Sequence, residues 1–256
     1  MKKIYFLIGF FLVSSFNMIA QPGPSPSPEE IKKKVEASKK ALDKASSNEA
    51  KTKLCLELAS LLLRTNRDES IEYAKKAVDF AVKSKKTDLI VNSYMSLGSG
   101  LQMSGQNAAS LDYLKKGLPY LKKSNNTETN GIYYGMIAQA YMRKGQYEIA
   151  LEYYQKSLFE YKKELTNMDL QALTLFQIGN VHGSLEDYMT AIKYFQQAAS
   201  IWKKLENWNR LEGCWKNIGN CYGMMNNENE EEAARIQQQK YSELAKKKVT
   251  SPPKRS

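Results

Sequence analysis

The stretch WKNIGNCYG, residues 215–223, decides the fold because a close copy of it, LFQIGNVHG, occupies residues 175–183. Both copies contain Ile-Gly-Asn, and in both a second glycine follows three residues after the asparagine. Glycine and asparagine are weaker helix formers than alanine or leucine. Their return in one register therefore indicates an internal repeat rather than a helix chosen for local propensity.

The phrase has four copies at an interval near forty residues. In each copy an aliphatic residue follows a large residue by three positions, a small residue comes next, and another large residue stands three positions later. The copies are YMSLGSGL (94–101), YGMIAQAY (134–141), LFQIGNVH (175–182) and WKNIGNCY (215–222). Their small residues, Gly98, Ala138, Gly179 and Gly219, are 40, 41 and 40 positions apart.

A second apolar segment follows each of the earlier copies. These segments are SLDYLKKGL from residue 110, ALEYYQKSL from 150 and AIKYFQQAA from 191, while SIEYAKKAV from 70 completes a fainter first copy around Ala59. Small residues seven positions apart on one helix face let two helices approach closely. Turn formers separate the two halves of a copy, so each unit is predicted to be a pair of antiparallel helices.

The pattern W-x-x-I-G-x-x-Y at residues 215–222 resembles the first half of the tetratricopeptide signature, with Ile in place of Leu. The pattern G-Q-Y-x-x-A-x-x-x-Y at residues 145–154 resembles its second half. The resemblance covers residues 49–245 and is nearest to exported bacterial tetratricopeptide proteins and to the sensory regions of signalling proteins. It implies an all-α solenoid of five helix pairs with capping helices at both ends.

The family's usual proline near each repeat end is missing here. Pro119 instead lies late in a predicted second helix, which it should kink or shorten because proline lacks a backbone donor. A very polar segment after Met225 is expected to form a C-terminal capping helix, since nothing stacks on the end of a solenoid.

The predicted organisation divides the chain into five parts: a signal peptide at 1–20, a Pro/Ser-rich linker at 21–28, an N-terminal helix at 29–46, the solenoid at 49–245 and a basic disordered tail at 246–256. Within the solenoid the repeats are predicted at about 49–86, 88–124, 131–165, 170–206 and 210–245.

The first twenty residues predict export. Lys2 and Lys3 precede an apolar run at 4–13, and Ala20 is a small residue at the expected cleavage site. An uncleaved membrane anchor is the alternative, because Met18 is not small, although the run is short for a span of about 20 residues. The mature protein is therefore expected to be periplasmic or otherwise in the cell envelope.

The formal charge of +11 is concentrated at the two ends of the chain rather than on the repeats. Nucleic-acid-binding modules usually gather basic residues on one folded face, so a nucleic-acid partner is not expected. The basic tail is interpreted as a solvated end, with weak contact to a membrane surface as an alternative.

No enzyme, metal site or cofactor is predicted. Cys214 and Cys221 would lie about 10 Å apart on one helix, at 1.5 Å rise per residue, which is too far for a disulfide. We interpret them and Cys55 as packing residues. His182 is the sole histidine and occupies an aromatic position of the repeat, which favours packing over catalysis. Motifs such as C-x-x-C and H-E-x-x-H are absent from the sequence.

The resemblance implies that the first helix of each pair lines a concave groove. At 100° per residue, Lys216, Asn220 and Gly223 lie away from the face that packs Trp215 and Ile218. The corresponding residues of the other copies complete the predicted groove: Asn180, Asn220, Gln139, Ser99, Lys216, Gly183, Gly223, Phe176, Met142 and Met95.

The amides of this set can pair with the backbone of an extended peptide, because an amide both donates and accepts. The glycines would allow close approach, and Phe176 and the methionines would add adaptable apolar contact. The alternative is that asparagine here is tolerated surface filler. The predicted function is an exported protein–protein interaction scaffold. The alternative function is a sensory or regulatory input module that lacks its output domain.

Overall fold

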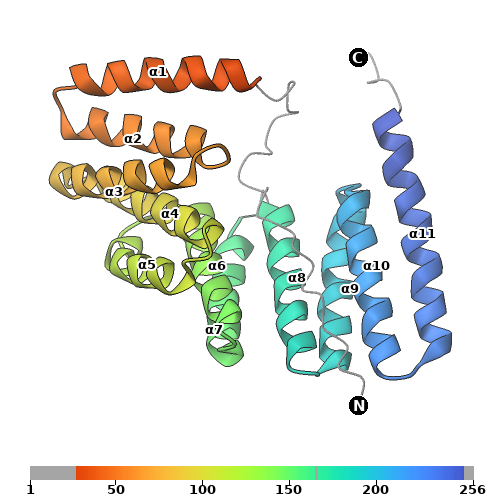
Figure 1. The fold of residues 1–256 in the computed structure, drawn as a ribbon. Coiled ribbons are helices and arrows are strands. Elements are labelled where there is room, and N and C mark those ends of the chain that lie inside the picture. Colours follow the sequence, from red (N-terminus) through yellow and green to blue (C-terminus); the bar gives the residue numbers. More distant parts are fainter. Residues whose placement is uncertain (1–26, 165–166, 251–256) are drawn as a thin grey trace.

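The computed structural model describes residues 27–164 and 167–250, and within these residues every regular element is helical (Figure 1). The predicted signal peptide, linker residues 21–26 and the last six residues lie outside the described part. The helices are α1 (Pro28–Lys44), α2 (Asn48–Leu62), α3 (Arg67–Ser84), α4 (Thr87–Met103), α5 (Asn107–Leu121), α6 (Thr127–Arg143), α7 (Tyr147–Lys162), α8 (Met168–Ser184), α9 (Tyr188–Lys204), α10 (Trp208–Met224) and α11 (Glu228–Thr250).

The N-terminal helix α1 begins at a capping box. The Ser27 hydroxyl accepts a hydrogen bond from the backbone N–H of Glu30 at 3.2 Å, and the Ser27 N–H donates to the Glu30 carboxylate at 2.6 Å. These bonds satisfy backbone donors that a helix start leaves unpaired. Val35 is buried with Leu58 and Leu62 of α2, so α1 covers the outer side of the first helix pair.

From α2 onward the helices form five pairs, each packed against its neighbours along the chain. In Figure 1 the helices α8 to α11 run alternately down and up, with short connections at either edge. The expected all-α array of helix pairs is therefore confirmed. Pro119 lies in the last turn of α5, which ends two residues later at Leu121.

The third pair begins earlier than predicted. The polar stretch before residue 131 reads as a loop, yet α6 begins at Thr127. Asn126 provides the reason, because its side-chain oxygen accepts a hydrogen bond from the backbone N–H of Thr129 at 2.8 Å. Asparagine is among the preferred N-cap residues, so most of the expected loop becomes the first helical turn.

The last helix is longer than predicted. The tail was expected to be disordered from residue 246, whereas α11 continues to Thr250. Tyr241 stacks on Trp208 of α10 with ring centroids 6.1 Å apart, and Ala245 is buried one turn later. This packing holds the helix together beyond the point at which its polar sequence suggests an end.

Small residues let the helices of this array approach closely. A Cβ atom at Gly117 would lie only 1.8 Å from the hydroxyl oxygen of Tyr133. Tyr133 is completely buried, and its hydroxyl donates to the Leu114 carbonyl at 2.9 Å. In the same way, a Cβ at Gly179 would lie 2.7 Å from the Phe195 ring. Gly117 and Gly179 therefore each make room for one large side chain.

The turns between paired helices also repeat. Gly105, Gly145, Glu186 and Asn226 hold equivalent positions with φ values of 77°, 72°, 63° and 56°. This is the left-handed region, which glycine adopts freely and a residue with a Cβ adopts at a cost. The first two turns use glycine, whereas Glu186 carries the strain.

We predict that Glu186→Gly raises the free energy of unfolding by about 0.5 kcal/mol, because relief of the left-handed strain outweighs the extra chain entropy of glycine. Gly145→Ala, at the equivalent turn, should lower it by about 1 kcal/mol. Urea denaturation followed by circular dichroism measures both. A loss of stability in Glu186→Gly would contradict the proposed strain.

We predict that Gly117→Ala lowers the free energy of unfolding by about 2 kcal/mol, because the added methyl group meets the Tyr133 hydroxyl in a full core. Adding Tyr133→Phe to this variant should recover part of the loss, which a double-mutant cycle measures as a coupling energy. Gly183→Ala is the control. A Cβ at Gly183 has no atom within 4 Å among the described residues, so this change should not destabilise the helix. Additive effects of the Gly117 and Tyr133 changes would be inconsistent with the proposed fit.

Candidate functional site

The first helices of the pairs form the inner layer of the array. Helix α2 contacts α4, and α4 contacts α6, in addition to the contacts inside each pair. A hydrogen bond between side chains joins α8 to α10 in the same layer. We call the solvent side of α4, α6, α8 and α10 that carries Ser99, Gln139, Asn180 and Asn220 the inner face.

A chain of side-chain amides crosses the inner face from α8 to α10. The Asn217 amide donates to the Asn180 side-chain oxygen at 3.2 Å, and the Asn180 amide donates to the Gln177 side-chain oxygen, also at 3.2 Å. Asn180 is therefore joined to Asn217 of the next repeat and not to Asn220. Gln177 and Asn217 are absent from the predicted set, although their aligned positions are polar in most copies.

Lys216 and Asn220 lie next to this amide chain on α10, and both are exposed. They are four residues apart and so occupy the same side of the helix. These two predicted residues can therefore meet a partner without rearrangement of the array. Gly183 leaves space beside α8, since a Cβ there would have no described atom within 4 Å.

Two predicted groove residues instead pack against other residues of their own helix pair. The Phe176 ring packs against Phe195 and Trp202, with ring centroids 5.2 and 5.7 Å away, so it belongs to the core between α8 and α9. A Cβ at Gly223 would lie 2.8 Å from the Glu231 carboxylate of α11. The predicted roles of Phe176 in ligand contact and of Gly223 in close ligand approach are thus not supported by their positions.

The remaining predicted residues are half-buried on α4 and α6. Met95 and Met142 pack on the main apolar core, while Ser99 and Gln139 keep part of their surface in solvent. Between these helices the buried Gln102 amide donates to the Met136 carbonyl at 2.9 Å. Gln102 is absent from the predicted set, and the sequence alone did not indicate this link between repeats.

Two surface hollows lie elsewhere. One, of about 590 Å³, is lined by Tyr134 on α6 and by the exposed side of α7 around Phe159. Another, of similar volume, lies among the loops that join successive pairs and includes Lys123 and Glu164. Both are open, so neither encloses a small molecule.

His182 is held by packing and a polar contact. Its ring stacks on Tyr194 with centroids 5.4 Å apart, and its Nδ1 lies 3.1 Å from the Asp187 carboxylate. The pKa of Asp187 is lowered by hydrogen bonds from Thr190 and by His182, and Asp187 also caps α9. The histidine thus joins the end of α8 to the start of α9.

The three cysteines are free and buried. Burial raises the pKa of both Cys55 and Cys221 to about 11 and raises that of Cys214 as well. Thiols with raised pKa values are poor nucleophiles and poor metal ligands. In residues 27–164 and 167–250 there is no group of three His, Cys, Asp or Glu side chains arranged to hold a metal ion.

None of the described helices combines the length and apolar character needed to cross a membrane.

The geometry defines the protein as an all-α helix-pair solenoid. The tetratricopeptide-repeat family model matches residues 132–158 and 172–201, which correspond to the third and fourth helix pairs. The chain therefore contains tetratricopeptide repeats in these two helix pairs. A search of curated proteins gave no match.

Solved structures with the same architecture match most of the chain. BtubC (BKLC) from P. vanneervenii is 16% identical, with 88% of this chain and 96% of that chain covered and a TM-score of 0.73. A putative kinesin light chain from Podosopora anserina with nearly identical TPR-like repeats is 15% identical, with 81% and 100% covered and a TM-score of 0.64. Aspartyl phosphate phosphatase F from Bacillus subtilis is 18% identical, with 77% and 52% covered and a TM-score of 0.67. At these identities the similarity concerns the fold.

The raised thiol pKa values predict a loss of stability in alkali. An unfolded thiol ionises near pH 9.0, whereas Cys55 and Cys221 keep their protons in the folded state up to about pH 11. The unfolded state therefore binds fewer protons in this window, and stability falls as the pH rises through it. We expect about 1 kcal/mol to be lost per thiol by about pH 10. Urea denaturation at neutral and alkaline pH measures this, and Cys55→Ala with Cys221→Ala should flatten the slope. An unchanged slope would contradict the assignment.

Proposed function

We propose that the protein is a non-catalytic scaffold whose inner face binds an extended segment of a partner protein. The observation that carries this proposal is the amide chain from Gln177 through Asn180 to Asn217, with Asn220 and Lys216 exposed on the same helix as Asn217. Packing between repeats does not require amides on this side of the helices. The tetratricopeptide fold supports a protein-binding role.

The amide chain is suited to bind a peptide backbone. An amide group has two N–H donors and an oxygen with two lone pairs, so one internal bond leaves each group able to form another. The internal bonds also fix the side chains before the partner arrives, which lowers the entropy that binding must remove. Because amides are neutral, the site should tolerate varied partner sequences.

A regulatory role is the second candidate. The similarity of fold to aspartyl phosphate phosphatase F supports it, because that protein is named for action on a phosphorylated aspartate. In this alternative the chain would transmit the binding of a partner to a separate signalling protein. Identification of the bound partner as a signalling subunit would favour this role over a purely structural scaffold.

Export is part of the proposal and depends on residues 1–20, which lie outside the described structure. Their basic start and apolar run support cleavage by signal peptidase. Mass spectrometry of the protein purified from its native envelope should find an N-terminus near residue 21. An intact Met1 in the cytoplasmic fraction would contradict export.

The inner-face site predicts a selective loss of peptide binding. Peptides selected from a random display library on the immobilised protein serve as probes, with affinity measured by fluorescence polarisation. The triple variant Asn180→Ala, Asn217→Ala, Asn220→Ala should bind them at least tenfold more weakly, because each lost hydrogen bond costs about 1 kcal/mol.

The matched control is Gln196→Ala with Gln197→Ala, which removes exposed amides from α9. This control should bind like the unaltered protein, and circular dichroism should show that both variants remain folded. Equal binding by the triple variant and the control would exclude the inner face as the site.

A further inference from the structure

A pair of lysines lies at or near the end of the second helix in most repeats. In each case the pair directly follows a buried residue of that helix. The segments are Leu121-Lys122-Lys123 at α5, Tyr161-Lys162-Lys163 at α7, Trp202-Lys203-Lys204 at α9 and Ala245-Lys246-Lys247 in α11. All eight lysines are exposed. The shared register places these lysines at the same edge of every pair, where one repeat is joined to the next.

The ends of these helices are close in space. Lys123 after α5 and Glu164 after α7 line the same hollow. The Trp202 indole at the end of α9 donates to the Asp169 carboxylate at the start of α8, at 2.8 Å. Figure 1 shows that α9 and α11 reach the same edge of the C-terminal half. We call the lysine pairs of α5, α7 and α9, with Phe159 and Leu205, the basic edge.

Large apolar side chains are exposed among these lysines. Phe159, in the last turn of α7, is 64% exposed, and Leu205, which caps α9, is 41% exposed. The Lys163 ammonium lies over the Phe159 ring, 4.8 Å from its centroid. Surfaces that lie in a lipid interface combine basic residues with large exposed apolar side chains.

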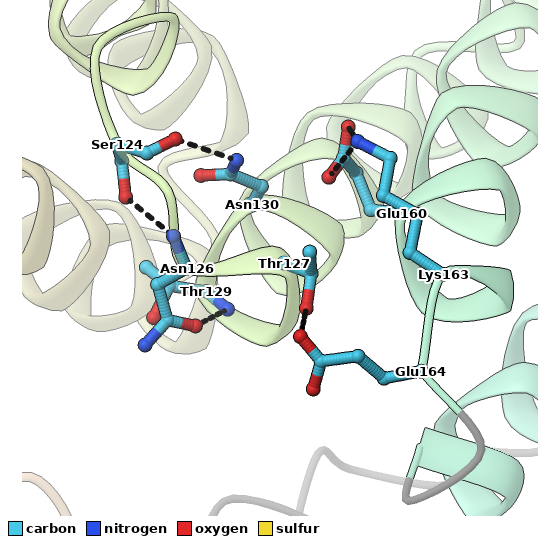
Figure 2. A network of polar contacts seen from close by, with 8 residues as sticks. All are labelled: Ser124, Asn126, Thr127, Thr129, Asn130, Glu160, Lys163 and Glu164. Atoms are coloured by element: carbon cyan, nitrogen blue, oxygen red, sulfur yellow. Dashed lines mark hydrogen bonds and ion pairs between the residues drawn. The ribbon is translucent and has the colours of Figure 1, made fainter.

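Three carboxylates at this edge are engaged within the protein, while Asp88 and Glu128 line the same hollow as Lys123. Figure 2 shows Glu160 held by Lys163, at 2.8 and 2.9 Å, and Glu164 accepting a hydrogen bond from the Thr127 hydroxyl at 2.6 Å. Asp169 receives the Trp202 hydrogen bond and lies 3.7 Å from the Arg210 guanidinium. The more distal lysines, such as Lys162 and Lys203, remain exposed beyond them.

Stabilisation of helix C-termini explains part of the pattern. A cation in the last turn interacts favourably with the helix dipole. That effect is local to each helix, however, and gives no reason for Phe159 and Leu205 to stand exposed beside the lysines.

We propose that the basic edge binds the surface of a bilayer that contains anionic phospholipids. The lysines would contact the headgroups, each contributing electrostatic attraction, while Phe159 and Leu205 enter the interfacial region. This inference is independent of the proposed peptide site, because the basic edge consists of helix ends and not of the inner face. The array could therefore hold a partner protein at a membrane surface.

The test is co-sedimentation of the protein, lacking residues 1–20, with vesicles. We expect binding to vesicles in which phosphatidylglycerol makes up one third of the lipid, none to pure phosphatidylcholine, and a steep loss with added salt. The edge variant should bind at least tenfold more weakly. It carries Lys122→Gln, Lys123→Gln, Lys162→Gln, Lys203→Gln and Lys204→Gln.

A control variant removes the same charge from the outer faces of the second helices and should keep at least half of the vesicle binding. It carries Lys75→Gln, Lys76→Gln, Lys115→Gln, Lys116→Gln and Lys193→Gln, all at exposed positions. Equal losses in both variants would show a general effect of net charge and overturn the proposal. Circular dichroism and thermal melting confirm that each variant is folded.

The apolar contribution has its own test. Phe159→Ser with Leu205→Ser should weaken vesicle binding severalfold with no change of charge. Met189→Ser with Met224→Ser is the control, since these exposed residues lie near the turns between paired helices, at the opposite edge.

Absence of binding to anionic vesicles by the unaltered protein would also overturn the proposal. So would equally tight binding to duplex DNA, because it would indicate a general polyanion site.

Discussion

The fold depends on the close approach of helices at positions occupied by glycine or alanine. Gly117 admits the buried Tyr133, and Gly179 admits Phe195. Because protein interiors pack at high density, a methyl group added at either position would clash with the neighbouring aromatic side chain. The repeated small residues thus fix the spacing of one helix on the next, and that spacing leaves one side of every first helix to solvent.

The helix pairs could be predicted because their apolar periodicity and small residues are local properties that recur in register. The exact first and last residues of the helices could not be predicted in this way. Helix α6 begins early because Asn126 caps it, and α11 continues to Thr250 because Tyr241 packs on Trp208 of α10 and Ala245 is buried one turn later. The start of α6 depends on which polar residue of the loop caps the helix. The end of α11 depends on a contact between two helices.

The sequence predicted which side of the helices carries the candidate site. It did not predict the hydrogen-bond partners of the residues in that site. Lys216 and Asn220 are exposed where the helical register places them, whereas Asn180 pairs with Asn217 and Phe176 turns into the core. A helical wheel gives the direction of a side chain around its own axis. The partner that it meets on the next helix depends on the stacking of the repeats, which no short segment of sequence specifies.

The inner face is the surface at which we propose that a partner protein binds. Photo-crosslinking in cells tests it most directly, with a photoreactive residue at Asn220 and, in a separate protein, at the exposed Gln196 of α9. The account predicts a discrete adduct from position 220, with crosslinked sites in one continuous segment of the partner as mapped by mass spectrometry. Adducts from position 196 alone, with none from position 220, would contradict it.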